Sequence, residues 1–241
     1  MRNARAVDIL TGSPYQFKAD DYSSHSAILR FAFSRPAGGR VLDLACDKGY
    51  LGERLKERFE VYGVERNPST AALARPHYRE VAVLDLARGP VPESFGIFDL
   101  IILGGILEHL PDPEAVLRSS LTRLQPSGRM IITTSNIAHW SVRLNLLFGR
   151  FEPADRGIMD RTHLHFWTFR GFRSLLEGCG LSVERLYGTA IPLPLVMPST
   201  ARGRPLHFLY RFYSLLVRVW PTLFGFEIIA EGRRAGDSSW V

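Results

Sequence analysis

The stretch Val41-Leu42-Asp43-Leu44-Ala45-Cys46-Asp47-Lys48-Gly49-Tyr50-Leu51 decides how this chain folds. Its apolar first residues are typical of a buried parallel strand, Gly49 permits a tight turn, and the residues from Gly52 onward have helical composition. A second apolar run, Val61-Tyr62-Gly63-Val64, ends in Glu65. In such an arrangement the loop lies at a helix N-terminus, and a carboxylate about 20 residues further on accepts the two hydroxyls of a ribose. The stretch therefore predicts a site for a nucleoside-containing cofactor.

Two kinds of cofactor use that geometry, and the loop distinguishes them. The dinucleotide fingerprint has glycine at three places, and here the first of these is Asp47, whose charge would face a pyrophosphate. Binding of a nicotinamide dinucleotide is therefore disfavoured. Asp43, at the tip of the first strand, instead suits a cofactor that carries a positive amino group.

An alternation of helices and apolar runs supports a parallel sheet covered on both faces. Pro111 and Pro113 mark the start of one helix, and Gly178 with Gly180 marks the end of another. Helices are expected at about 23–34, 48–58, 68–75, 113–124 and 168–178, and strands at 41–44, 61–64, 81–84, 98–103, 129–134 and 181–187.

Val41 to Leu51 resembles the first motif of class I S-adenosylmethionine methyltransferases. The resemblance continues at Asp85, which matches the acid after the third strand, and at 98–113, which contains a Glu-His-Leu signature. It extends through 128–136, which resembles the fifth strand, and through 138–168, which is similar to a bacterial branch associated with cell-surface glycans, lipids and secondary metabolites. About residues 40 to 232 are covered.

The resemblance implies an α/β, Rossmann-like class I methyltransferase fold, with a mostly parallel seven-stranded sheet and helices on both faces. It implies one domain over 1–241, with 137–167 and 188–222 as insertions or a cap on the acceptor side. The implied cofactor is S-adenosylmethionine. The residues expected to bind it are Asp43, Ala45, Cys46, Asp47, Gly49, Tyr50, Glu65, Asp85, Leu86, Leu103 and Gly104.

The expected reaction is attack of an acceptor atom on the sulfonium methyl group, and a hydroxyl acceptor must also lose its proton. Imidazole titrates in the right range for that step. His109, after the fourth strand, and His163, in the following insertion, are the candidate catalytic bases; His139 is the next candidate. We expect O-methylation of a sugar, a lipid-linked intermediate or another small metabolite.

A metal site is not expected, although Glu108 and His109 with His139 or His163 offer ligand types. Some enzymes that resemble this segment carry an additional carboxylate three positions before Glu108, where this chain has Gly105. A hard cation prefers several oxygen ligands. Glu108 is instead interpreted as an acid at a helix start or as a hydrogen-bonding group in the active site.

Asp47 departs from the family pattern, because it replaces a glycine close to where the carboxylate of the methionine moiety would lie. Weakened or lost cofactor binding is therefore an alternative, since two carboxylates at short range repel each other. The segment 136–168 also resembles accessory proteins of a methionine pathway. The alternative function is a cofactor-binding partner protein without robust methyltransferase activity of its own.

Positive charge is concentrated near the C-terminus of this 241-residue chain. The segment 201–234 contains six arginines and two glutamates, a balance of +4 within a net charge of +6. Arg204, Arg211 and Arg218 recur every seven residues and so share one stripe of a helix over 204–220, whose remaining surface is rich in aromatic and aliphatic residues. The helix is interpreted as a cap of the acceptor pocket, a contact with an anionic membrane surface, or an oligomer interface.

Other features of the sequence indicate where the protein is located and which classes of partner it binds. No apolar run reaches the roughly 18 residues of a membrane span, and Met1–Arg5 leads into no secretory core, so a cytoplasmic protein is expected, with possible peripheral contact at the inner membrane face. No motif supports nucleic-acid binding. Cys46 and Cys179 lie in unrelated motifs and are interpreted as buried thiols. Oligomeric state is left open.

Overall fold

The molecule is built on one seven-stranded sheet in a computed structural model that describes residues 22–192 and 204–236. The strand order is β3-β2-β1-β4-β5-β7-β6; the first five strands in the chain run parallel, and β7 is antiparallel to both of its neighbours. This confirms the predicted fold class. The strands are β1 Arg40–Leu44, β2 Glu60–Glu65, β3 Glu80–Val83, β4 Phe98–Gly104, β5 Leu124–Ser135, β6 Leu181–Gly188 and β7 Glu227–Arg234.

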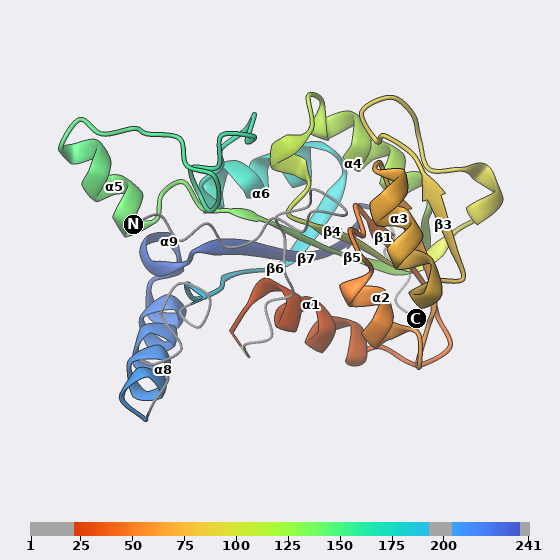
Figure 1. Cartoon of the computed structure of the whole chain (residues 1–241), viewed down its shortest axis with the longest axis horizontal. Coiled ribbons are helices and arrows are strands. Elements are labelled where there is room, and N and C mark those ends of the chain that lie inside the picture. Colours follow the sequence, from red (N-terminus) through yellow and green to blue (C-terminus); the bar gives the residue numbers. More distant parts are fainter. Residues whose placement is uncertain (1–21, 193–203, 237–241) are drawn as a thin grey trace.

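Helices cover both faces of the sheet (Figure 1). The main ones are α1 Ser24–Phe33, α2 Tyr50–Leu55, α3 Pro68–Ala74, α4 Pro113–Thr122, α5 Trp140–Leu147, α6 Phe169–Gly178, α8 Arg204–Val219 and α9 Pro221–Phe224. Short 3₁₀ turns lie at η1 Arg75–His77, η2 Glu93–Phe95 and η3 Leu107–His109.

Alternate residues of each central strand enter different cores, because successive side chains of a strand point to opposite faces. In β4, Ile101 and Leu103 join the core beneath α4 and α6, whereas Leu100 and Ile102 join the core beneath α1 and α2. All four are at most 2% exposed. Burial on both faces explains why these strands are continuous apolar runs.

The predicted elements agree closely with the structure, but β7 was not among the predicted strand ranges and β5 differs clearly in length. This strand begins at Leu124, five residues before the predicted start at 129, and its pairing with β4 shifts register between Phe98 and Leu100. The polar residues at the start of β5 gave no strand pattern. Cys46 and Cys179 are buried and free, as predicted.

The chain after β5 leaves the sheet and forms the segments that were predicted to lie on the acceptor side. Asn136 is fully buried and donates from its side-chain amide to the carbonyls of Thr222 and Gly225, so the end of β5 is tied to α9. Of the predicted cap over 188–222, residues 193–203 lie outside the described residues. Among the helices that are described, none is long and apolar enough to cross a membrane.

Candidate functional site

The turn after β1 holds two residues in a left-handed backbone conformation that normally favours glycine. Ala45 has φ 61° and Asp47 has φ 46°, and Gly49 follows with φ 88°. A Cβ at Gly49 would lie 3.0 Å from the backbone of Ala74, so a larger residue would crowd this neighbour as well as strain the backbone. Ala45 and Asp47 thus keep the backbone of a glycine-rich loop while lacking two of its glycines, at some conformational cost.

Asp43 lies behind this loop. Its carboxylate is 2% exposed and accepts a 2.6 Å hydrogen bond from the Tyr78 hydroxyl, which in turn accepts from the backbone N–H of Gly52. Burial raises the pKa of Asp43 to about 7, and the Tyr78 hydrogen bond offsets only part of this effect. Sequence reasoning missed Tyr78, because no spacing rule links a residue after α3 to the tip of β1.

Glu65 ends β2 and faces the same loop. Its two oxygens accept hydrogen bonds from the backbone N–H groups of Asn67 at 2.9 Å and of Asp47 at 3.2 Å. Burial raises its pKa, and the Asp47 charge adds to the effect. Asp43, Asp47 and Glu65 therefore form a cluster of mutually repelling carboxylates, which a cationic ligand would stabilise.

The other residues that were expected to bind the cofactor differ in their burial and in their contacts. Gly104 is exposed at the end of β4, whereas Leu103 is 0% exposed and lies in the core between β1 and β5. Asp85 accepts from the Ala87 N–H and forms an ion pair with Arg88 at 3.5 Å. Cys46 is buried in the turn, where its carbonyl accepts from the N–H of Gly49, and Tyr50 and Leu86 are half-buried.

His109 and His163 are brought together beyond the end of β4. Their rings meet edge to face with centroids 4.8 Å apart. The insertion reaches this place because the backbone N–H groups of Leu164 and His165 both donate to the Glu108 carbonyl, at 2.7 and 3.3 Å. The two predicted catalytic histidines are therefore neighbours, although 54 residues separate them in the chain.

Hydrogen bonding fixes the same tautomer in both rings. Nδ1 of His163 faces the carbonyl of Ile158 at 3.2 Å, and a carbonyl only accepts, so this nitrogen carries the proton. Nδ1 of His109 lies 3.1 Å from the Thr162 hydroxyl. This hydroxyl donates a hydrogen bond to the Asp160 carboxylate, so it accepts a hydrogen bond from the ring nitrogen. In each histidine, Nε2 is left with its lone pair.

Both histidines are neutral at physiological pH. Burial lowers the pKa of His109, against a smaller opposing effect of Thr162 and Asp160. Burial also lowers the pKa of His163, and the neighbouring His109 adds to this. An unprotonated Nε2 in a neutral imidazole is the form required of a general base.

Glu108 lies beside this pair. It is 4% exposed, and burial raises its pKa to about 7. One possible metal-ligand atom from each of Glu108, His109 and His163 lies within 4.8 Å of the others. The structure thus supplies one carboxylate and two imidazoles, a set that hard cations such as Mg²⁺ disfavour. Absence of a metal stays a prediction.

His139, the third candidate base, is fully buried and caps α5. Its Nδ1 accepts from the backbone N–H of Ser141 at 3.3 Å, and its Nε2 donates to the Tyr213 hydroxyl at 2.8 Å. The Tyr213 hydroxyl in turn donates a hydrogen bond to the carbonyl of Phe224. Because both ring nitrogens are engaged, His139 has a structural role.

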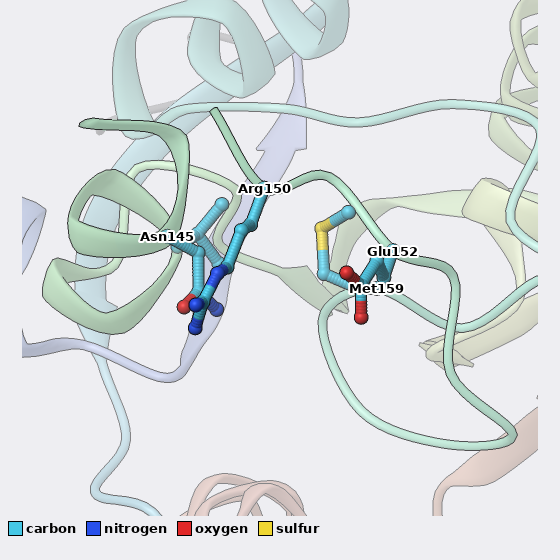
Figure 2. A pocket seen from close by; sticks show the side chains of 5 residues that line it. Asn145, Arg150, Glu152 and Met159 are labelled. Carbon is cyan, nitrogen blue, oxygen red and sulfur yellow. The ribbon is translucent and has the colours of Figure 1, made fainter. Parts of the chain in front are cut away.

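A small hollow of about 200 Å³ lies within the insertion after β5. In Figure 2, Asn145 and Arg150 lie on one side of it and Glu152 and Met159 on the other. The hollow contains none of the expected cofactor residues.

Comparisons with known proteins agree with this architecture. A family model described as a methyltransferase domain matches residues 18–186. The ubiquinone biosynthesis O-methyltransferase of Xanthomonas axonopodis pv. citri (strain 306) is 35% identical over 111 residues, which cover 42% of this chain and 45% of that protein. The protein of the same description from Chromobacterium violaceum is 36% identical over 110 residues, covering 42% and 46%. The matches thus span less than half the length of these curated relatives.

Solved structures show the same fold at low sequence identity. The S-adenosylmethionine dependent methyltransferase from Mesorhizobium loti has a TM-score of 0.60 at 19% identity, over 89% of this chain and 99% of that one. The magnesium protoporphyrin IX methyltransferase from Synechocystis PCC 6803 with bound S-adenosylmethionine has a TM-score of 0.55 at 15% identity, over 88% and 78%.

Replacing Ala45 by glycine should stabilise the protein. Glycine adopts positive φ without a steric penalty, which removes about 1–2 kcal/mol of strain, and the greater freedom of glycine in the unfolded chain cancels about 0.5–1 kcal/mol of this gain. Urea denaturation should therefore show a gain of several tenths of a kcal/mol or more. Ala87→Gly, where φ is not positive, is the matched control and should destabilise. Equal losses in both variants would contradict the strain at Ala45.

The pH dependence of stability should report the burial of neutral His139. Burial lowers its pKa from 6.5 to about 4, so the unfolded chain binds this proton first as the pH falls. The contribution of neutral His139 to the free energy of unfolding is complete above pH 6.5 and is lost progressively towards pH 4. His139→Asn should reduce stability at pH 7.5 and flatten the decline between these pH values, measured by thermal denaturation. His77→Asn is the control, and an unchanged slope in His139→Asn would refute the assignment.

Proposed function

The chain belongs to the methyltransferase domain family, and on that premise we propose that it uses S-adenosylmethionine as its cofactor and methylates a hydroxyl group of a small acceptor. The acceptor classes are a sugar, a lipid-linked intermediate or another small metabolite. The observation that carries the proposal is the His109–His163 pair, which presents two unprotonated Nε2 atoms beyond the end of β4.

The reaction is an in-line displacement. A lone pair of the acceptor oxygen forms a bond to the sulfonium methyl carbon, the carbon–sulfur bond breaks, and S-adenosylhomocysteine leaves with the electron pair. The acceptor proton passes to Nε2 of His109 or His163. Much of the acceleration comes from holding oxygen and methyl group in line, since the sulfonium is already reactive.

The cofactor is assigned to the carboxylate cluster at the tips of β1 and β2. Glu65 is proposed to accept the ribose hydroxyls, because its carboxylate is already oriented by two backbone N–H groups. Asp43 and Asp47 provide negative charge for the ammonium of the methionine moiety. Ala45, Cys46, Gly49 and Tyr50 form the loop around it, and Asp85, Leu86, Leu103 and Gly104 are assigned to the adenosine side.

Methylation of a hydroxyl group is supported by the relatives, since both of those named above are described as ubiquinone biosynthesis O-methyltransferases. An O-methyltransferase needs a base that accepts the hydroxyl proton, and either neutral histidine of the pair could serve as that base. The hollow between Arg150 and Glu152 lies in the insertion assigned to the acceptor and offers charges of both signs to a polar substrate.

Cofactor affinity should depend on the two buried carboxylates. Asp43→Asn and Glu65→Gln each remove a charge while keeping size, and each should weaken binding by roughly 2–4 kcal/mol, or about 30-fold to 1000-fold. Because the pKa of Asp43 is about 7 in the empty site, wild-type affinity should fall as the pH drops below 7, when the carboxylate becomes protonated.

Isothermal titration with S-adenosylmethionine at pH 6, 7 and 8 measures both effects. Glu53→Gln, at an exposed glutamate of α2, is the matched control for loss of one charge. If all variants bind like wild type, this assignment of the carboxylates is wrong.

Turnover should require the histidine pair. His109→Gln and His163→Gln should each leave cofactor affinity nearly unchanged, and replacing the residue that serves as the base should lower kcat by about 100-fold to 10,000-fold. Because burial lowers both pKa values, wild-type activity should persist below pH 6.5. Formation of S-adenosylhomocysteine with phenolic, sugar and lipid-linked acceptors is the readout, and His165→Gln is the control. Full activity in both variants would exclude base catalysis by these rings.

The same assay with EDTA tests the role of Glu108. We propose that the rate is insensitive to chelation. Activity lost in EDTA and restored by one divalent cation would instead assign Glu108, His109 and His163 to a metal. Intact cofactor binding without transfer to any acceptor would favour the role of a cofactor-binding partner protein.

A further inference from the structure

Exposed apolar side chains are concentrated in two segments. Twelve of the eighteen large hydrophobic side chains that are exposed among the described residues lie in 140–151 and 208–220. The most exposed are Leu147 at 78%, Val219 at 77%, Phe208 at 74% and Phe148 at 69%. This is an unusual concentration, because exposed apolar residues on a monomer are normally scattered singly.

Helix α8 explains how its apolar residues come to face outward. One side of it, with Tyr210, Ser214 and Val217, is buried against the body of the protein. The opposite side carries a second apolar stripe at helical spacing, formed by Phe208, Phe212, Leu215 and Val219, each at least 51% exposed. A helix that only completed the core would need apolar residues on one side.

The charge of both segments has one sign. Residues 140–151 and 204–226 contain no aspartate or glutamate. Their exposed charged residues are arginines: Arg143 and Arg150 in and after α5, and Arg211 and Arg218 on α8. By the helical period, Arg211 and Arg218 lie along one border of the exposed apolar stripe. Apolar residues bordered by arginines suit a surface that is hydrocarbon inside and anionic outside.

A hollow on α8 combines these properties. It has a volume of about 580 Å³ and is lined by Arg211 and Arg218 together with Phe208, Phe212 and Leu215. Two guanidinium groups beside aromatic and aliphatic side chains match an acidic headgroup with the start of its acyl chains.

The two segments are held at one end of the molecule (Figure 1). Tyr213 of α8 accepts from the rings of His139 and Trp140 at the start of α5, at 2.8 and 3.3 Å. His139 is fully buried, so this junction is part of the folded body.

We propose that α8 and the α5 region form a docking surface for a lipid bilayer that contains anionic lipids. The helix lies in the interfacial plane, with its exposed stripe in the headgroup and acyl boundary and its arginines at the lipid phosphates. The docking does not depend on which acceptor is methylated. It extends the expectation drawn from residues 204–220 by adding the segment 140–151.

Vesicle flotation tests the docking with the full chain. Binding to vesicles of phosphatidylcholine with about 30% phosphatidylglycerol should exceed binding to pure phosphatidylcholine, and should weaken as salt rises from about 50 to 500 mM. The variant R211A/R218A should bind about 25-fold more weakly, at about fivefold per arginine. R79A/R88A, which removes the same charge at the β3 edge, is the matched control and should bind like wild type.

Two apolar variants separate the segments. F208S/F212S on α8 and L147S/F148S on α5 should each reduce vesicle binding, and an unchanged melting temperature and cofactor affinity would show that each variant is folded. No binding to anionic vesicles at low salt would overturn the proposal. So would equal losses in R211A/R218A and R79A/R88A. Concentration-dependent dimers by light scattering, abolished by F208S/F212S and without vesicle binding, would assign the surface to a second copy of the chain.

Discussion

The site depends on the way Asp43 is held beneath the loop that follows β1. Its carboxylate accepts from Tyr78, and Tyr78 accepts from the N–H of Gly52 in the first turn of α2, so one hydroxyl joins the strand, the helix and the segment after α3. A Cβ at Gly52 would lie 2.3 Å from the Tyr78 ring, and one at Gly63 would lie 2.8 Å from the Cys46 sulfur. Small residues thus let the tyrosine lie under the loop, and the loop in turn brings Asp47 to Glu65.

A second network organises the segments that follow β4 and β5. Asn136 and His139, just after β5, bind the carbonyls of α9 and the hydroxyl of Tyr213. The backbone carbonyl of Glu108 accepts hydrogen bonds from the N–H groups of residues 164 and 165, and these bonds place His163 against His109. Both arrangements use buried polar groups to fix the ends of long connections, where apolar burial alone would leave several positions equivalent.

The parts that were predictable are those in which local pattern determines structure. Apart from Asp43, Val41–Leu44 is apolar, as is Ile101–Leu103, because both faces of a parallel strand are buried; Pro113 starts α4 as predicted, and Asp112 caps it. The contacts of Tyr78, Asp160 and Thr162 were not predictable, because each depends on where a distant backbone segment docks. Leu103 illustrates the intermediate case: its position at the strand end was correct, but strand alternation sends its side chain into the core.

The carboxylate cluster of Asp43, Asp47 and Glu65 has a consequence for the catalytic cycle. In the proposed function, the cofactor brings both an ammonium and a sulfonium to these negative charges before transfer; afterwards the sulfur is a neutral thioether and only the ammonium remains. The attraction between protein and cofactor therefore declines during the reaction itself, because one of the two positive charges is lost with the methyl group. Carboxylates that repel one another when the site is empty would then favour the doubly cationic cofactor over its singly cationic product.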